Sequence, residues 1–188
     1  MRPELTGGRA LNDGRGRVLA AAAALVASLG VVACGGPDGG AGPGAAAPSA
    51  MDFALQSTEG KTVHLSDYLG KDVVLIDFWS TTCDPCMTEM PHLVDLYKAQ
   101  KDKGFVVLAV SLDGPESLAD VNRVVHDKDM IFPVLLDQET TVVSRFNPKK
   151  EMPFAVLIDR SGKIIKKKPG YQPGDEKILA EEVAQALK

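Results

Sequence analysis

The feature that most constrains this chain is an apolar run leading into two closely spaced cysteines. Residues Val73 to Trp79 are apolar, with the single exception of Asp77. A run of this kind is typical of a central strand covered on both faces. Cys83-Asp84-Pro85-Cys86 follows three residues later, and a helical pattern begins there. The sequence therefore predicts a buried strand followed by a helix whose N-terminus carries both cysteines.

The spacing of the cysteines favours redox chemistry. A thiolate, the reactive form of cysteine, is stabilised by the N–H groups and the dipole of a helix N-terminus. Cys86 lies one turn further along and can attack a mixed disulfide formed by Cys83. A zinc site needs about four ligands, and the sequence has no second cysteine pair or Cys/His cluster. Haem attachment needs His after the second cysteine, where Met87 stands. A structural disulfide at this spacing would close almost no loop.

The first 33 residues are predicted to be an export signal. Four arginines precede Val18–Val32, a 15-residue apolar run that is short for a membrane span and suits a signal peptide. The run ends in Val31-Val32-Ala33-Cys34, which resembles a bacterial lipobox, so we expect Cys34 to carry lipid after cleavage. The alternative is an ordinary signal peptide or an uncleaved anchor. In that alternative Cys34 would be a free thiol in an oxidising compartment, which argues against it.

Residues 34–50 are predicted to be a flexible tether, and residues 51–188 a single folded domain. The tether is nearly all Gly, Ala and Pro after Cys34 and cannot form a core. Residues 34–188 contain 17 basic and 23 acidic side chains, a formal charge of −6. This charge argues against nucleic acid or an anionic membrane surface as the partner. Lys166-Lys167-Lys168 is the one basic cluster, and we interpret it as a solvated strand end.

The hydrophobic pattern of residues 51–188 predicts an α/β fold. Strands alternate with helices and are followed by a terminal hairpin and helix, which indicates a mixed sheet with helices on both faces. Pro91 lies inside the first helical pattern and is expected to kink it. The expected strands are 73–79, 105–112, 132–137, 154–159 and 163–168; the expected helices are 84–101, 114–127, 139–146 and 175–187; a hairpin is expected within 53–65.

Several motifs occur in order: DFAL at 52–55, GKTVHLSD at 60–67, GKDVVLIDFW at 70–79, CDPC at 83–86, FPVLLD at 132–137 and PFAVLID at 153–159. Together they resemble the exported thioredoxin-fold thiol:disulfide oxidoreductases of the TlpA/ResA type, in their lipoprotein form. The resemblance covers nearly all of residues 51–188. It implies a thioredoxin-like three-layer sandwich with an N-terminal β-hairpin extension, and neither a cofactor nor a metal.

The resemblance also implies roles for individual residues. Cys83 would be the exposed nucleophile and Cys86 the buried resolving thiol. Pro153 would be a cis proline facing the disulfide, with the Met152 backbone pairing with an extended substrate segment. Asp77 stands where thioredoxins have an aspartate that exchanges protons with the buried thiol, and burial would raise its pKa toward the working pH. The alternative for Asp77 is a carboxylate that accepts a hydrogen bond from a backbone amide or a buried water.

The predicted substrate rim departs from the family pattern. Thr82 stands where thioredoxins commonly have Trp, and Phe154 replaces the Thr usual after the cis proline. Asp113 and Glu116 are candidates for a second acid near the cysteines, with capping of the following helix as the alternative. Trp79 is expected to form a wall of the site and part of the core. The residues expected to contact substrate are Trp79, Thr82, Asp84, Pro85, Met152 and Phe154.

The predicted function is disulfide reduction outside the cytoplasm. Asp84 disfavours the Cys83 thiolate, which makes the reduced form less stable and the couple more reducing. We expect a lipid-anchored monomer that reduces oxidised exported proteins, apocytochrome c being one candidate, and that is re-reduced by a membrane electron donor. One alternative is a peroxiredoxin-like enzyme, although Ile76 and Ser80 replace the Pro and Thr of its Pro-x-x-x-Thr-x-x-Cys frame. The other is a copper-binding assembly factor that uses both cysteines and a histidine.

Overall fold

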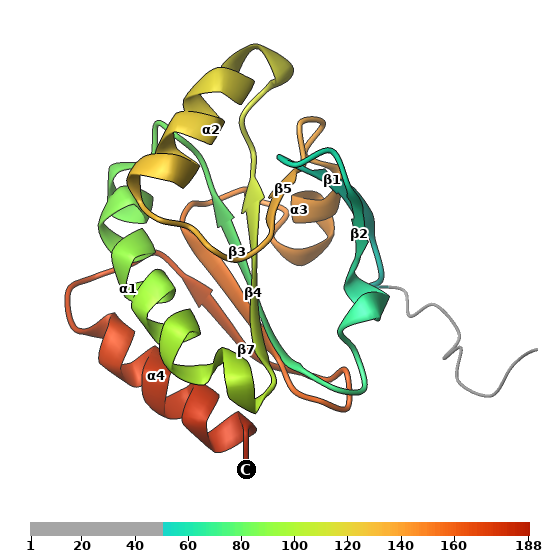
Figure 1. Cartoon of the computed structure of the whole chain (residues 1–188), viewed down its shortest axis with the longest axis vertical. Helices are drawn as coiled ribbons and strands as arrows, with labels where there is room; N and C mark the ends of the chain where they lie inside the picture. The colour runs from blue at the N-terminus through green and yellow to red at the C-terminus, as the bar shows by residue number, and fades with distance from the viewer. Residues whose placement is uncertain (1–50) are drawn as a thin grey trace, which may run out of the picture. The chain divides into compact units, whose positions relative to one another are not determined.

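The computed structural model describes residues 51–188. The predicted signal peptide, the lipidation site at Cys34 and the tether to residue 50 lie outside the described residues. Residues 51–188 form a seven-stranded mixed sheet with helices on both faces (Figure 1). The predicted three-layer α/β sandwich with an N-terminal hairpin is therefore confirmed.

The elements match those expected from the hydrophobic pattern. The strands are β1 (Ala54–Ser57), β2 (Thr62–His64), β3 (Val73–Trp79), β4 (Phe105–Ser111), β5 (Val134–Leu136), β6 (Phe154–Ile158) and β7 (Ile164–Pro169). The helices are α1 (Asp84–Gln100), α2 (Leu118–Asp127), α3 (Thr141–Phe146) and α4 (Asp175–Ala186). Short 3-10 turns occupy Leu65–Asp67, Lys101–Lys103 and Pro115–Ser117. Pro91 lies inside α1, which continues past it as one helix.

The strand order places the start of α1 beyond the carboxyl ends of the parallel strands. The order is β2-β1-β5-β4-β3-β6-β7, in which β3, β4 and β5 run parallel and the other pairs are antiparallel. In open α/β sheets, sites form beyond the carboxyl ends of the parallel strands. Cys83 and Cys86 lie beyond the carboxyl end of β3, where residues 80–83 connect the strand to α1.

Strand β3 is buried on both faces and contributes to two separate cores. Val74 and Ile76 pack with Val143 of α3 on one face of the sheet. Leu75 and Trp79 belong to the cluster on the other face, which α1, α2 and α4 cover (Figure 1). This division follows from the alternation of side chains along a strand.

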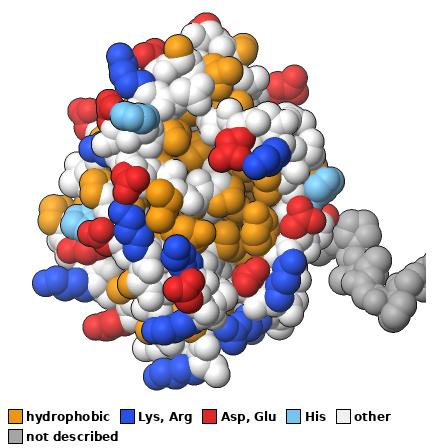
Figure 2. Space-filling view, in the orientation of Figure 1, with side chains coloured by type: hydrophobic (Ala, Val, Ile, Leu, Met, Phe, Trp, Pro, Cys, Tyr) orange, Lys and Arg blue, Asp and Glu red, His pale blue; other side chains and the backbone are white. Residues whose placement is uncertain are grey.

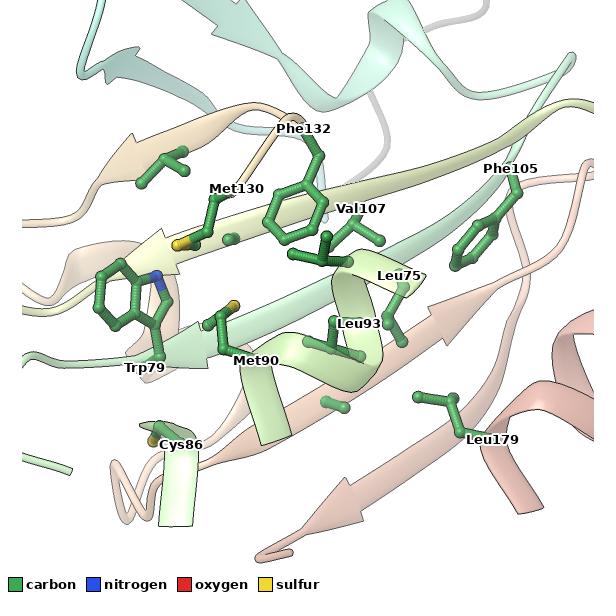
Figure 3. Packing of buried hydrophobic residues seen from close by; sticks show 14 of the residues in the cluster. Leu75, Trp79, Cys86, Met90, Leu93, Phe105, Val107, Met130, Phe132 and Leu179 are labelled. Atoms are coloured by element: carbon green, nitrogen blue, oxygen red, sulfur yellow. The ribbon is translucent and has the colours of Figure 1, made fainter. Parts of the chain in front are cut away.

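Figure 3 shows the second of these cores, with Met90 and Leu93 of α1 lying against the sheet and Cys86 at the end near Trp79.

On the surface, apolar side chains gather at the centre of one face, and charged side chains of both signs surround them (Figure 2). Among residues 51–188, no helix is both long enough and apolar enough to span a membrane.

A buried carboxylate stabilises the start of α3. The Asp137 side chain is 2% exposed, and its Oδ2 accepts a hydrogen bond from the Val143 N–H at 2.7 Å. Its Oδ1 accepts a second from the Val142 N–H at 3.2 Å. Thr140, the residue that precedes the helix, makes no side-chain cap. Asp137 therefore performs the capping, and its negative charge is favourable at a helix N-terminus.

We predict that Asp137→Ala lowers the free energy of unfolding by about 1–3 kcal/mol, because two buried N–H groups lose their acceptor. Urea unfolding of the full-length chain measures the effect as a lower midpoint with an unchanged slope. Glu139→Ala removes an exposed acid from the same connection and should change stability by less than about 0.5 kcal/mol. Equal effects of the two substitutions would contradict the capping role.

Candidate active site

The two cysteines form a disulfide at the start of α1. The S–S distance is 1.99 Å and the Cα–Cα distance is 5.3 Å. Cys83 is the residue that caps the helix, and its Sγ accepts a hydrogen bond from the Cys86 N–H at 3.3 Å. Pro85 lies in the first turn, where its missing N–H leaves no intrahelical bond unmade. The pair is therefore placed where a helix N-terminus stabilises a sulfur anion.

Cys83 is less accessible than expected. Its exposed fraction is 9%, compared with 1% for Cys86, and both side chains belong to the core cluster beneath α1. The expectation of an exposed nucleophile holds only relative to its partner. The physical reason is that the bond to Cys86 holds the Cys83 side chain against this core.

Asp77 is buried in β3, as predicted, with an exposed fraction of 1%. Its Oδ1 accepts no hydrogen bond from any residue between 51 and 188. Burial, followed by the nearby Glu89 carboxyl, raises the pKa of Asp77 well above its usual range, while Lys168 opposes the shift. A carboxyl in this environment holds its proton to a higher pH than an exposed carboxyl does.

Glu89 is a second buried acid, which the sequence analysis missed. It lies in α1, is 4% exposed, and its Oε2 has no hydrogen-bond partner among the described residues. Burial raises the pKa of Glu89 to about 7, with Lys168 opposing the shift and Asp175 adding to it. The available signal was its spacing: residues three apart share a helix face, so Glu89 faces the core with Cys86.

Unpartnered polar atoms are concentrated in the layer between β3 and α1. Within residues 51–188, the buried side-chain atoms without a partner are Asp77 Oδ1, Trp79 Nε1 and Glu89 Oε2. Folded proteins leave few such atoms, and a concentration of them beside perturbed acids marks a functional site. Trp79 is 0% exposed, so its place in the core is confirmed. β3 directs the ring inward beneath α1, and its role as a substrate contact stays a prediction.

Asp113 positions the loop before Cys83. Its Oδ1 accepts a hydrogen bond from Thr81 Oγ1 at 2.6 Å, and its Oδ2 accepts one from Ser111 Oγ at 2.8 Å. The Thr81 N–H also donates to this carboxylate, at 3.0 Å. Asp113 thus ties the loop after β3 to the end of β4 and does not cap the following helix. Glu116 is exposed in the 3-10 turn before α2.

The remaining rim residues divide into exposed and half-buried positions. Thr82, Asp84 and Pro85 are exposed around the disulfide. The peptide bond between Met152 and Pro153 is cis, as the resemblance implied. Met152 is half-buried and packs against the core cluster that contains both cysteines. These positions leave Thr82, Asp84, Pro85 and the Met152 backbone as the candidates for substrate contact.

Phe154 does not form part of this rim. Its side chain is 7% exposed and belongs to the core on the α3 side, with its ring centroid 6.4 Å from that of Phe78. Its neighbour Ala155 belongs to the core on the α1 side. Because side chains alternate along β6, the ring of Phe154 must lie on the face opposite the disulfide. This position gives no support to the prediction that Phe154 contacts substrate, which stays a prediction.

Comparisons with known proteins agree with this geometry. The AhpC/TSA family model matches residues 43–167. Thiol-disulfide oxidoreductase ResA of Bacillus cereus is 36% identical over 127 residues, covering 68% of this chain and 71% of its own. ResA of Halalkalibacterium halodurans is 33% identical over 143 residues, covering 76% of this chain and 77% of its own.

The chain belongs to the ResA-type thiol-disulfide oxidoreductases of the AhpC/TSA family. A solved structure from Chlorobium tepidum, assigned as the thiol:disulfide interchange protein DsbE, has the same fold. It is 35% identical, with a TM-score of 0.66, and the match covers 73% of this chain and 94% of that one. The ResA-type assignment agrees with a redox-active Cys83–Cys86 pair. In the described part of this ResA-type chain, no group of three or more His, Cys, Asp or Glu side chains is arranged to hold a metal ion.

We predict that Glu89→Gln changes the dependence of stability on pH. The unfolded chain releases the Glu89 proton near pH 4.5, whereas the folded protein holds it until about pH 7. Glu89 should therefore contribute a loss of about 3 kcal/mol of stability in the wild type as the pH rises from 4 to 8, and the Gln variant should lack this contribution. Urea unfolding at both pH values measures the difference. If the free energy of unfolding of the variant differs from that of the wild type by the same amount at pH 4 and at pH 8, Glu89 does not titrate between these pH values.

Proposed function

We propose that this protein is a membrane-tethered disulfide reductase for oxidised cysteine pairs in exported proteins. The observation that carries the proposal is a redox disulfide at a helix N-terminus above two buried acids that titrate at raised pH. Removal of residues 1–33 would leave lipid on Cys34 and a tether to residue 50. A membrane donor would then re-reduce the domain outside the cytoplasm, and apocytochrome c is one candidate substrate.

In the first step the Cys83 thiolate attacks one sulfur of the substrate disulfide. A Cys83–substrate disulfide forms, and the other substrate sulfur leaves as a thiolate. The helix N-terminus favours Cys83 for this role, because its Sγ accepts a hydrogen bond from the Cys86 N–H in the first turn of α1. Cys83 is also the more accessible sulfur of the pair.

In the second step Cys86 resolves the mixed disulfide. Cys86 loses its proton, attacks Cys83 Sγ and releases the second substrate thiolate, so that two electrons have passed to the substrate. The proton needs an acceptor in a layer from which water is largely excluded. Asp77 and Glu89 can accept it, because burial raises the pKa of both carboxyls, that of Glu89 to about 7. Bulk solvent then takes the proton from this pair.

Asp84 supports the reducing direction. Its carboxylate is exposed between the cysteines at the first position of α1. A negative charge there disfavours the neighbouring thiolate and so destabilises the reduced form. The exposed position of Thr82 and the half-buried position of Met152 support their role in binding an extended substrate segment.

The reduction potential of the Cys83–Cys86 couple tests the proposal. We predict a value of about −250 mV or lower for the full-length chain equilibrated with thiol buffers, near the thioredoxin end of the scale. Asp84→Asn should raise it by roughly 5–20 mV, since one charge near a helix terminus contributes about 0.3–1 kcal/mol. Asp95→Asn, at an exposed site later in α1, is the matched control and should leave it unchanged. A wild-type value near about −120 mV would indicate an oxidant and refute the proposal.

We predict that Asp77→Asn slows disulfide exchange by about 10-fold or more at pH 7, because Cys86 loses a proton acceptor during resolution. The reduction potential should change far less, because a proton acceptor that returns its proton to solvent lowers the barrier to resolution without changing the balance between dithiol and disulfide. Stopped-flow reaction of the reduced chain with an oxidised peptide measures the rate, with Asp95→Asn again as the control. An unchanged rate would exclude Asp77 from proton transfer.

A further inference from the structure

Asp77 lies in a row of residues that crosses three strands. In the β3–β6 pair Asp77 is opposite Ala155, and in the β6–β7 pair Ala155 is opposite Lys168. Residues directly opposite each other on neighbouring strands point to the same face of a sheet. All three side chains therefore point to the face that α1 and α4 cover. The middle position holds only a methyl group, so no bulky side chain of β6 separates the acid from the lysine.

Lys168 is held in place by several partners and differs from the rest of its basic run. Its side chain is 17% exposed, compared with 47% for Lys166. Its Nζ donates a hydrogen bond to the Gly170 carbonyl at 2.7 Å and lies 2.9 Å from Asp175 Oδ2. The same atom is 5.5 Å from the centroid of the Tyr171 ring. The interpretation of this residue as part of a solvated strand end is therefore wrong.

The charge of Lys168 acts on both buried acids. It lowers the pKa of Asp77 and of Glu89, in opposition to burial. Asp175, at the start of α4, acts in the other direction on Glu89.

The other titratable groups beside this cluster come from α1 and from the segment that leads into α4. His92 of α1 stacks on Tyr171 with ring centroids 6.2 Å apart. The Tyr171 hydroxyl donates a hydrogen bond to Glu176 Oε2 at 2.9 Å. Lys168 is the cation whose charge acts on both Asp77 and Glu89, and its position is fixed by the sheet register and by Asp175.

We propose that Lys168 is a positioning residue for disulfide exchange, because its fixed ammonium group sets the charge of the Asp77–Glu89 pair. The inference rests on the proposed function, in which these acids accept the Cys86 proton. Lys168 exchanges neither a proton nor an electron in this scheme. It stabilises the deprotonated acids, and the pH range in which they can act as proton acceptors therefore depends on it.

The test is the exchange rate of the full-length chain with an oxidised peptide between pH 5 and pH 9. Resolution needs deprotonated acids, so the exchange rate should fall as the pH is lowered and the two acids take up protons. In Lys168→Met the midpoint of this fall should move up by about half a pH unit or more, because the cation that favours deprotonation is lost. Lys168→Arg keeps the charge and should retain the wild-type midpoint.

The matched control is Lys166→Met. Lys166 lies on the same strand and, two residues away, on the same face, and it forms an ion pair with Glu182 of α4. Its loss should leave the midpoint in place. A wild-type midpoint in Lys168→Met, or an equal shift in Lys166→Met, would overturn this inference alone. A wild-type rate with no fall on the acid side would overturn the proposed acid pair as well.

Discussion

The burial of β3 on both faces is the constraint on which the site depends. Because both faces are covered, each side chain of this strand lies in one core or the other, and an acid in the strand cannot reach solvent. The same strand ends beside the N-terminus of α1, so the disulfide and the buried acid lie at the same end of one layer. Asp113 fixes the loop between them by accepting hydrogen bonds from Thr81.

Asp77 and Glu89 lower the stability of the fold, and the same burial that does so raises their pKa values. Moving a carboxylate out of water disfavours its charged form, and two such groups close together disfavour a second charge further. Asp77 and Glu89 therefore titrate as a pair and not as independent groups. A protein selected for stability alone would place apolar side chains here. Their presence, with atoms that lack hydrogen-bond partners, supports the proposed role in proton transfer.

Much of the fold and part of the site were predictable from the sequence. The apolar run of β3, the cysteine spacing and the ordered motifs identify the sheet, the redox pair and the cis proline before any coordinates. Glu89 was missed because an acid in an amphipathic helix is ordinarily exposed, and only its register with Cys86 argues otherwise. Phe154 was misplaced because the motif fixes its position along β6 but not which face its ring joins. Lys168 was misread because its environment depends on the pairing of the β6–β7 hairpin with β3, which is distant in sequence, and on its contact with Asp175 of α4.

Strand β7 is the last strand of the sheet, and the edge it leaves unpaired has a further consequence. An unpaired strand presents free N–H and C=O groups that can recruit a strand from another molecule, and lysines and proline are among the residues that discourage this. β7 contains three consecutive lysines followed by Pro169. The lysine run that includes Lys168 is therefore also expected to discourage this edge from pairing with a strand of another molecule. A substitution of Lys168 would therefore alter two properties at once, the charge beside the buried acids and the resistance of this edge to pairing with another strand.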